Sequence, residues 1–421
     1  KQFEPGESAG EDYEVYDTWD EFASYFMGRI GSHNGDPNTW AFLIKFENDI
    51  DLGGYSKKKV ACEEPFTPID LVSIDNSNNS NRPFVVDGDD HTIKNFCYIA
   101  EGAHASFFGT LKAATIKNLN FENAYVVAKM DDPQTVLNAA VVVNEANNTS
   151  FENVSVSKSK VYGWNSAAVA YAANGNSRFS DVRVDDVLLA LNEESAGPQV
   201  WHFYDKVSYR GGVVANLYGQ TNISNVSVSK LVVPDSVAQI MQRNNASYIG
   251  ASYVGGIIGI ASVSMDGSTS FSLEGCTVSA ELTGSSVGGL IGSVSPFSIT
   301  QGSIFEVANA DVTFKSGDYS GANQNRYLGG LVGALSWRNG SVQLSKNKVE
   351  TTIKNTKTEG SVGSRLGGVV GVYTGLGGGE DAVADFTINE NDVAVDISSS
   401  DTALAVGGIV GYALVNATNS T

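Results

Sequence analysis

A six-residue phrase recurs through the second half of the chain and limits the folds that the chain can adopt. It reads VGGIIG at 254–259, VGGLIG at 287–292, LGGLVG at 328–333, LGGVVG at 366–371 and VGGIVG at 406–411. The second residues of these copies fall at 255, 288, 329, 367 and 407, so the intervals are 33, 41, 38 and 40 residues. A phrase repeated at such intervals predicts a repeat protein.

Weaker copies extend the series toward the N-terminus. They read GGVVA from Gly211, AAVAY from Ala167 and AAVVV from Ala139, which adds intervals of 28, 44 and 44 residues. A period that drifts between 28 and 44 residues indicates a fixed core unit with insertions at loops.

Segments between the copies alternate apolar with polar residues and are rich in Val, Thr, Ile and Phe. They cover 150–163, 222–233, 270–282, 342–353 and 385–397. Alternation with a period of two residues is typical of strands, and the intervening Asn, Gly, Ser and Asp clusters are typical of turns. After about residue 35 no stretch has the apolar spacing of an amphipathic helix, so the sequence predicts an all-β fold.

Two architectures place about three short strands in each repeat: a propeller blade and one coil of a parallel β-helix. We favour the β-helix, because a blade needs four strands with tight hairpins and Asn-Gly or Asp-Gly turn signals are sparse. In a β-helix the same position of every coil stacks about 4.8 Å from the next. Paired glycines would then allow a close backbone approach that a Cβ would block.

The repeat glycines are therefore assigned a structural role. A phosphate-binding glycine loop would need a helix that starts directly after it and usually a lysine, and neither is present. The structural glycines are Gly255, Gly256, Gly259, Gly288, Gly289, Gly292, Gly329, Gly330, Gly333, Gly367, Gly368, Gly371, Gly407, Gly408 and Gly411.

Residues 13–30 are predicted to form a helix that caps the first coil. Thr18 and Glu21 have the spacing of a capping box. One helix face would carry Trp19, Phe22, Ala23, Phe26, Met27 and Ile30. The expected organisation is an N-terminal extension with this helix at 1–35, the first coils at 36–125, and repeat coils at 126–421 that continue into, or are capped by, another segment.

Charge and cysteine content restrict the class of protein. The net charge is −20 and the pI is near 4.5, so nucleic acid is not an expected partner. No stretch approaches the roughly 18 to 20 apolar residues of a transmembrane helix.

Cys62 and Cys97 form a candidate disulfide because both lie in the irregular N-terminal third, whereas Cys276 has the setting of a small buried apolar residue. The first residue is Lys, which is typical of a processed or trimmed chain.

Several ordered motifs between 42 and 121 resemble the first segment of bacterial surface proteins with GLUG repeats. The similar runs are FLIKFENDIDLGG (42–54), FTPIDL (66–71), PFVVDGDDHTIKNF (83–96) and ASFFGTLKAATIKNLNF (105–121). The residues that carry the resemblance are Asn48, Asp49, Asp51, Leu52, Pro68, Ile69, Asp87, Gly88, His91, Ile93, Asn95, Phe108, Gly109, Ile116, Asn118 and Leu119. The later six-residue copies match the GLUG motif, so the resemblance covers roughly residues 15 to 415.

This resemblance implies a right-handed parallel β-helix on a secreted or cell-surface protein, with adhesin-like or structural roles. The motif implies no catalytic site. The chain departs from the family pattern in FVVDGDDH, which lacks the usual F-G-T-F opening, and in the copies that carry Ala-Ala.

Two groups of acidic residues suggest chemistry and were weighed against simpler roles. Asp87, Asp89, Asp90 and His91 could serve acid–base hydrolysis, although Asp87-Gly88 is typical of a turn. The Asp49/Asp51 pair could bind calcium, but the spacing of known calcium loops is missing. We therefore expect no catalytic residue, no cofactor and no metal site.

A glycan-binding surface is the more plausible site. The insertions around 125–138, 188–210 and 234–253 carry four aromatic residues that could stack on sugar rings, or else pack within their own loops: Trp201, Tyr204, Tyr209 and Tyr248. Candidate N-glycosylation acceptors are Asn148, Asn153, Asn222, Asn225, Asn245, Asn339 and Asn416.

Three functions remain open from the sequence. The favoured one is an extracellular or cell-surface, non-enzymatic adhesin or structural display rod, with host or environmental glycans or surface proteins as partners. The second is a carbohydrate-active enzyme, a polysaccharide lyase or hydrolase, on the same scaffold. The third is a filament subunit that self-associates through an uncapped C-terminal coil, because no capping helix follows the last copy.

Overall fold

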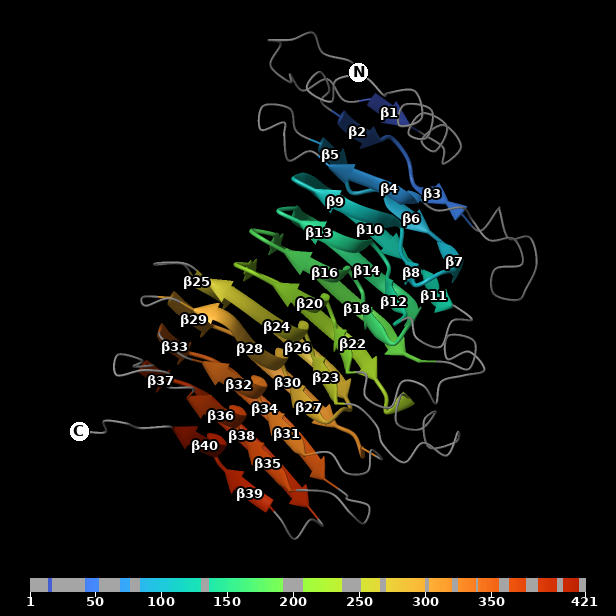
Figure 1. Cartoon of the computed structure of the whole chain (residues 1–421). Helices are drawn as coiled ribbons and strands as arrows, with labels where there is room; N and C mark the ends of the chain where they lie inside the picture. The colour runs from blue at the N-terminus through green and yellow to red at the C-terminus, as the bar shows by residue number, and fades with distance from the viewer. Residues whose placement is uncertain are drawn as a thin grey trace.

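The computed structural model describes most of the chain from residue 84 onward and shorter pieces before it. The described residues are 14–16, 42–52, 69–75, 84–129, 136–191, 207–236, 251–265, 270–299, 303–319, 325–337, 340–355, 363–375, 385–399 and 404–415. Their strands form three sheets, here named A, B and C, in which every pairing between named strands is parallel. Figure 1 shows the strands stacked in chain order, from blue β1 to red β40.

Sheet A has 21 strands. They are β1 (Glu14–Tyr16), β2 (Phe42–Phe46), β3 (Ile50–Asp51), β5 (Phe84–Asp87), β6 (Thr92–Lys94), β7 (Cys97–Glu101), β10 (Ala114–Glu122), β11 (Tyr125–Lys129), β14 (Ser150–Tyr162), β17 (Arg178–Ser180), β18 (Arg183–Ala190), β21 (Asn222–Ser224), β22 (Ser227–Val233), β25 (Ser270–Glu274), β26 (Thr277–Leu282), β29 (Ser303–Ala308), β30 (Asp311–Ser316), β33 (Gly340–Ser345), β34 (Lys348–Asn355), β37 (Asp385–Asn389) and β38 (Asp392–Ser399).

Sheets B and C have ten and nine strands. Sheet B contains β4 (Ile69–Asp75), β9 (Phe108–Lys112), β13 (Val143–Asn147), β16 (Ala170–Asn174), β20 (Val214–Tyr218), β24 (Ile258–Met265), β28 (Ile291–Ile299), β32 (Val332–Trp337), β36 (Val370–Gly375) and β40 (Val410–Val415). Sheet C contains β8 (His104–Ala105), β12 (Asn138–Ala140), β15 (Asn165–Ala167), β19 (Ser208–Gly211), β23 (Ser252–Gly255), β27 (Ser286–Gly288), β31 (Arg326–Gly329), β35 (Ser364–Gly367) and β39 (Leu404–Gly407).

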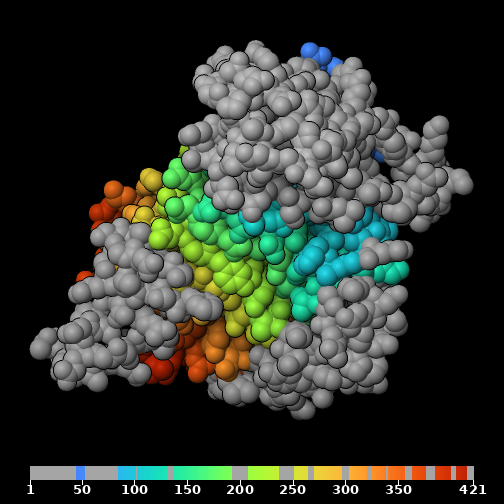
Figure 2. Space-filling view, turned by 45° about the horizontal axis from the view of Figure 1, so that its top comes forward, coloured from blue at the N-terminus to red at the C-terminus, as the bar shows by residue number. Residues whose placement is uncertain are grey.

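The chain visits the sheets in the same order in each later coil. It runs through two segments of sheet A, one strand of sheet C and one strand of sheet B, as in β21, β22, β23 and β24, and then returns to sheet A. Each strand pairs with its equivalent in the next coil, which is the arrangement of a parallel β-helix and not of a propeller. In Figure 2 the colours accordingly follow one another in bands across the described surface.

Identical positions of successive coils form continuous apolar columns inside the β-helix. In sheet A one column joins seven residues that are each at most 1% exposed: Ile116, Phe151, Phe179, Ile223, Leu273, Val307 and Leu344. The rings of Phe151 and Phe179 stack with centroids 4.9 Å apart. These side chains bury their apolar surface against their own equivalents, which explains the alternating pattern of the strand segments.

Some coils of sheet A have two residues with positive φ, such as Asn153 and Lys158, and the first of these positions recurs as a bend in every later described coil. Asn153, Asp181, Asn225, Asn309, Lys346 and Glu390 hold this position, and Gly275 holds it in one coil. The backbone N–H of Asn225 donates to Glu274 O, and that of Asn309 donates to Ser345 O, so the bends are stacked as well. Asn and Asp tolerate the left-handed region better than most residues, which explains their place between the strand segments.

The six-residue copies form the corner between sheets C and B and lie directly over one another. The register joins Gly211, Gly255, Gly288, Gly329, Gly367 and Gly407 in sheet C. A Cβ on Gly288 would overlap the carbonyl oxygen of Ile291, and one on Gly289 would overlap that of Gly330 in the next coil. The predicted close backbone approach is therefore confirmed.

The alignment of the earliest copy was wrong by one residue. Gly211 pairs with Ala167, and Ala167 pairs with Ala140 and not with Ala139. In the run AAVVV the copy could begin at Ala139 or at Ala140, because both are small residues that precede the valines. Only the strand pairing distinguishes these two alignments. Val141 consequently stands where later coils have their second glycine.

The helix predicted for residues 13–30 is wrong at its beginning. Glu14–Tyr16 form β1, which pairs with Ile44–Phe46 of β2. The run EVY alternates polar with apolar residues and adds a strand to sheet A. The rest of the predicted helix, including Thr18, Glu21 and its apolar face, lies outside the described residues. No helix among the described residues is long and apolar enough to cross a bilayer.

The last described coil, β37 to β40, exposes residues that earlier coils bury. Val406 and Ile409 are 50% and 41% exposed, whereas their equivalents Leu366 and Val369 in the preceding coil are 0% exposed. The difference arises because no further described coil covers this end of the three sheets.

Candidate functional site

Tyrosines stand in line on the outer face of sheet C. Tyr209 pairs with Tyr253, Tyr253 with Ser286, and Ser286 with Tyr327, so one outward position of the sheet carries three tyrosines in four coils. We name Tyr209, Tyr253 and Tyr327 the tyrosine row. All three side chains are half-buried.

The rings of the tyrosine row are held in fixed orientations. Those of Tyr209 and Tyr253 lie 7° from parallel with centroids 6.1 Å apart. This distance exceeds the coil spacing of about 4.8 Å, so the rings are offset and part of each face is left uncovered. Burial, and then the nearby Tyr218 hydroxyl, raises the pKa of Tyr209, and burial likewise raises the pKa of Tyr253, so both hydroxyls are neutral donors at physiological pH.

Sheet B and the next coils extend the aromatic surface. Tyr218 on β20 is 41% exposed, and its hydroxyl accepts a hydrogen bond from Asn216 Nδ2 at 2.7 Å. Arg365 follows Tyr327 in the sheet C register, with its guanidinium 6.0 Å from the Tyr327 ring centroid and 4.9 Å from that of Tyr412. The surface therefore offers ring faces, phenol hydroxyls and one cation along the axis of the β-helix.

The structure describes one of the four aromatic residues predicted for glycan stacking. Tyr209 is the first member of the tyrosine row, on a strand and not in an insertion loop. Trp201, Tyr204 and Tyr248 lie outside the described residues. Sequence reasoning missed Tyr253 and Tyr327, although both stand two residues before a repeat glycine, as Tyr209 does before Gly211.

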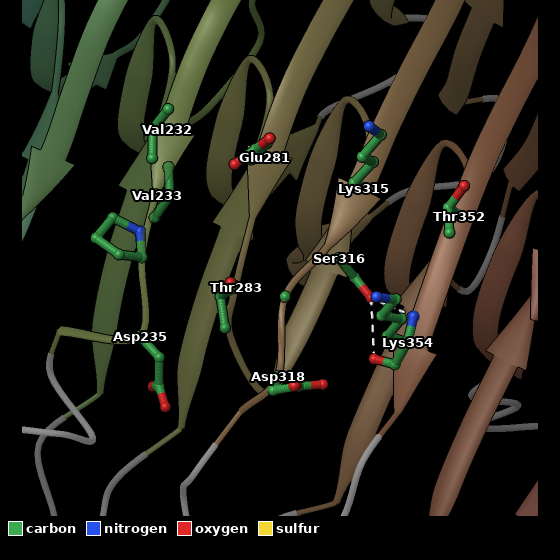
Figure 3. Close-up of a pocket in the computed structure, with 12 residues that line it drawn as sticks. Val232, Val233, Asp235, Glu281, Thr283, Lys315, Ser316, Asp318, Thr352 and Lys354 are labelled. Atoms are coloured by element: carbon green, nitrogen blue, oxygen red, sulfur yellow. Dashed lines mark hydrogen bonds between the residues drawn. The ribbon is translucent and has the colours of Figure 1, made fainter. Parts of the chain in front are cut away.

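A pocket of about 440 Å³ lies where four strands of sheet A end. β22, β26, β30 and β34 supply its walls, and Figure 3 shows the lining side chains spread along these side by side strands and the segments that follow them. The register places Val232, Glu281, Lys315 and Thr352 in one outward row. Asp235, Thr283, Asp318 and Lys354 follow beyond or at the strand ends.

A buried arginine lies behind this pocket. Arg326, 4% exposed, donates from Nη2 to Gly317 O at 3.1 Å and from Nη1 to Lys354 O at 3.3 Å and Asn355 Oδ1 at 2.9 Å. Gly317 and Lys354 both line the pocket, so the guanidinium holds two of its walls in place. Burial lowers the pKa of Arg326 to about 10, against the opposing effect of Tyr319, Asp235 and Asp318, and the group stays charged at neutral pH.

A second buried arginine stands in the interior of sheet C. Arg210 is 1% exposed and takes the place that Val254 holds in the next coil. It donates from Nη2 to Gly163 O at 3.2 Å, and its positive charge is favoured by Asp235, a pocket residue that is 6% exposed. Asp235 also favours the charged form of Arg326. Two buried cations thus stand near one buried carboxylate of the pocket.

The acidic residues considered for catalysis hold backbone turns together. Asp87 is 7% exposed; its carboxylate accepts from Asp89 N and Asn118 Nδ2, both at 3.0 Å, and lies 3.1 Å from Lys117 Nζ. These bonds outweigh burial and lower the pKa of Asp87. The His91 ring lies 3.4 Å from Asp49 and not against Asp87.

The two aspartates considered for calcium have partners of their own. Asp49 accepts from Thr92 N at 2.9 Å and from Lys94 Nζ at 2.6 Å, and Asp51 accepts from Asn95 Nδ2 at 2.7 Å. In the described ranges no three His, Cys, Asp or Glu side chains come together to hold a metal ion.

The cysteines differ in state. Cys97 takes part in a disulfide, while Cys62, its predicted partner, lies outside the described residues, so the pairing stays a prediction. Cys276 is a free, fully buried thiol in the interior of sheet A. Burial raises its pKa from 9.0 to about 11.

Four of the candidate glycosylation sites are among the described residues, on sheet A or at the turn that leads into it. Asn148, Asn222 and Asn225 are exposed. Asn153 Nδ2 instead donates to Asp90 Oδ1 and Asn118 Oδ1, both at 3.0 Å, so a glycan there would displace two hydrogen bonds. Asn245, Asn339 and Asn416 lie outside the described residues.

Comparisons with known proteins assign no family to the chain. No family model matches the chain, and no curated protein matches it. Among solved structures the chain is similar to a crystal structure of a putative immunoglobulin A1 protease from Bacteroides ovatus, with 16% identity and a TM-score of 0.34 over 98% of this chain and 87% of that one. This similarity is too weak to assign an activity, and the resemblance to the GLUG-repeat proteins stays an expectation from sequence.

Proposed function

We propose that the protein is a non-enzymatic, extracellular or cell-surface β-helix that displays binding surfaces along its sides, and that the tyrosine row binds glycans. The observation that carries the proposal is the alignment of Tyr209, Tyr253 and Tyr327 on one face of a rigid parallel sheet.

The geometry of the row suits an extended carbohydrate. Partly uncovered ring faces can pack against the apolar face of a sugar, and phenol hydroxyls can bind its hydroxyl groups. The row runs along the β-helix axis, so neighbouring sugars of one chain can contact neighbouring coils. Because the tyrosines stand on paired strands, they lose little further freedom on binding.

A glycan array tests this proposal. We expect bound glycans whose signal weakens about three- to tenfold in Tyr253→Ala, because one aromatic contact contributes about 0.5–1.5 kcal/mol. The matched control is Tyr162→Ala, since Tyr125 and Tyr162 form another tyrosine pair, on sheet A, with centroids 5.5 Å apart.

Two results would count against the proposal. Equal losses in Tyr253→Ala and Tyr162→Ala, or no bound glycan at all, would remove the role of the tyrosine row. Release of sugar from a bound polysaccharide would overturn the non-enzymatic part.

We also propose self-association through the last described coil, as a second candidate function. Val406 and Ile409 are substantially exposed in columns that are otherwise buried, and four strand edges are unpaired there among the described residues. A further parallel coil, supplied by a second copy of this chain, would cover both the apolar residues and the edges.

Sedimentation velocity over a range of concentrations tests self-association. We expect concentration-dependent growth that Val406→Glu with Ile409→Glu abolishes, because two buried carboxylates would face the partner. Val232→Glu, at a similarly exposed valine of sheet A, is the control and should leave growth unchanged. A strictly monomeric protein at every concentration would contradict the proposal.

A further inference from the structure

The pocket at the ends of β22, β26, β30 and β34 contains charged side chains that the fold itself does not use. The side chains of Glu281, Lys315, Asp318 and Lys354 form no ion pair within the described part of the chain, although each stands at the pocket surface. Elsewhere on sheet A comparable side chains are paired, as Lys348 is with Asp311 at 3.6 Å. Unpaired charges of both signs around one hollow point to a ligand.

The balance of charge at this pocket differs from that of the whole protein. The chain carries a net charge of −20. At the pocket, Lys315 and Lys354 stand beside three carboxylates, those of Asp235, Glu281 and Asp318, and the buried Arg326 donates hydrogen bonds to the pocket walls. The two lysines offer an anionic group a favourable place in this acidic protein, beside carboxylates that can accept hydrogen bonds.

The buried arginine adds an independent sign of a binding site. Its Nε has no hydrogen-bond partner among the described residues, although Arg326 is only 4% exposed. A buried guanidinium N–H without a hydrogen-bond partner destabilises the folded state. Such a charged group is typical of functional sites, where its positive charge acts on a ligand. Arg326 donates hydrogen bonds to the carbonyls of Gly317 and Lys354, so its positive charge lies directly behind the pocket walls.

The remaining lining groups suit hydroxyl groups. Asp318 and Glu281 can accept hydrogen bonds, and the hydroxyls of Thr283 and Thr352 can donate or accept them. No aromatic side chain is among the described lining residues, so the pocket has no surface for stacking a nucleobase. Its volume of about 440 Å³ lies within the usual range of small-ligand pockets, about 300–1,000 Å³.

We propose that this pocket binds an acidic sugar, a monosaccharide unit that carries a carboxylate. Lys315 and Lys354 hold the sugar carboxylate, and Asp318, Glu281 and the two threonines bind its ring hydroxyls. The pocket is formed by sheet A and the tyrosine row by sheet C, so this site is separate from the surface proposed above and does not depend on it.

Titrations followed by saturation-transfer NMR test the site in the full chain. The probes are sodium glucuronate, methyl glucoside, which lacks the carboxylate, and sodium acetate, which lacks the sugar. We expect glucuronate to bind at least about tenfold more tightly than either other probe, because charge-assisted and neutral hydrogen bonds both contribute. Added salt should weaken binding.

Variants assign the binding to the pocket. Lys315→Met with Lys354→Met should weaken glucuronate binding by about tenfold or more, while Lys348→Met, which removes a charge from the same strand β34 outside the pocket, should not. Asp318→Asn should weaken glucuronate without increasing the binding of acetate. Circular dichroism of each variant confirms that it is folded.

Three results would overturn the proposal. One is the absence of saturable glucuronate binding, and another is equal binding in the double lysine variant. The third is an affinity for acetate or methyl glucoside equal to that for glucuronate, which would show that the pocket does not recognise the carboxylate and the hydroxyl groups together.

Discussion

Most repeat glycines leave room for a specific atom of the corner between sheets C and B. At the second glycine position, a Cβ on Gly368 would overlap the carbonyl oxygen of Gly408 in the next coil and lie 2.9 Å from Val393 Cγ1. Gly408 occupies the same position one coil later, and a Cβ there would meet nothing within 4 Å. At this second position the requirement for glycine thus comes from the neighbouring coil, whereas at the first position it comes from a carbonyl of the same corner, as at Gly367 and Val370.

This difference predicts unequal effects of the same substitution. Gly368→Ala should lower the free energy of unfolding by about 1–3 kcal/mol, because the added methyl group forces two coils apart. Gly408→Ala should change it by no more than about 0.5 kcal/mol. Urea unfolding followed by circular dichroism measures both, and equal effects of the two substitutions would contradict the role given to the corner.

At the scale of strands and coils, sequence periodicity predicted the strand segments and corners that recur in every coil, but it missed features that change from one coil to the next. The alternation of apolar residues located the sheet A segments, and the six-residue copies located the corner, because each coil imposes the same environment at the same position. The interior column through Val226, Cys276 and Ala310 instead ends in Asn347, whose amide accepts from Ala310 N at 2.9 Å and donates to Val307 O at 3.1 Å. A change from apolar to polar residues along one column cannot be read from a single repeat.

The candidate sites show the same division. The sequence predicted Tyr209 as an aromatic residue of an insertion that could stack on sugar rings, but its alignment with Tyr253 and Tyr327 requires the strand register. The pocket was not predicted at all, since Asp235, Glu281, Asp318 and Lys354 come from four coils and share no local motif. The extra residues between copies, which differ in length from coil to coil, hide the spacing that brings these side chains together.

At the scale of the whole molecule, the three surfaces proposed for binding lie on different parts of one stack of coils. The outer face of sheet C carries the tyrosine row, the strand ends of sheet A form the pocket, and the last described coil presents the apolar residues of its interior columns. The tyrosine row and the pocket depend on the same stacking of coils, because each combines residues of neighbouring coils, such as Tyr209 with Tyr253 and Glu281 with Lys315.

Distances between spin labels test that stacking most directly. One label is placed at Ser150 and the other at Glu306, Gln343 or Thr387, which share its outward column of sheet A. The buried thiol of Cys276, whose pKa burial raises to about 11, should stay unlabelled. If the coils are stacked, pulsed electron paramagnetic resonance should give distances from Ser150 of about 19 Å to Glu306, about 24 Å to Gln343 and about 29 Å to Thr387. These are four, five and six spacings of about 4.8 Å. A distance to Thr387 no longer than the distance to Glu306 would contradict the stack of coils.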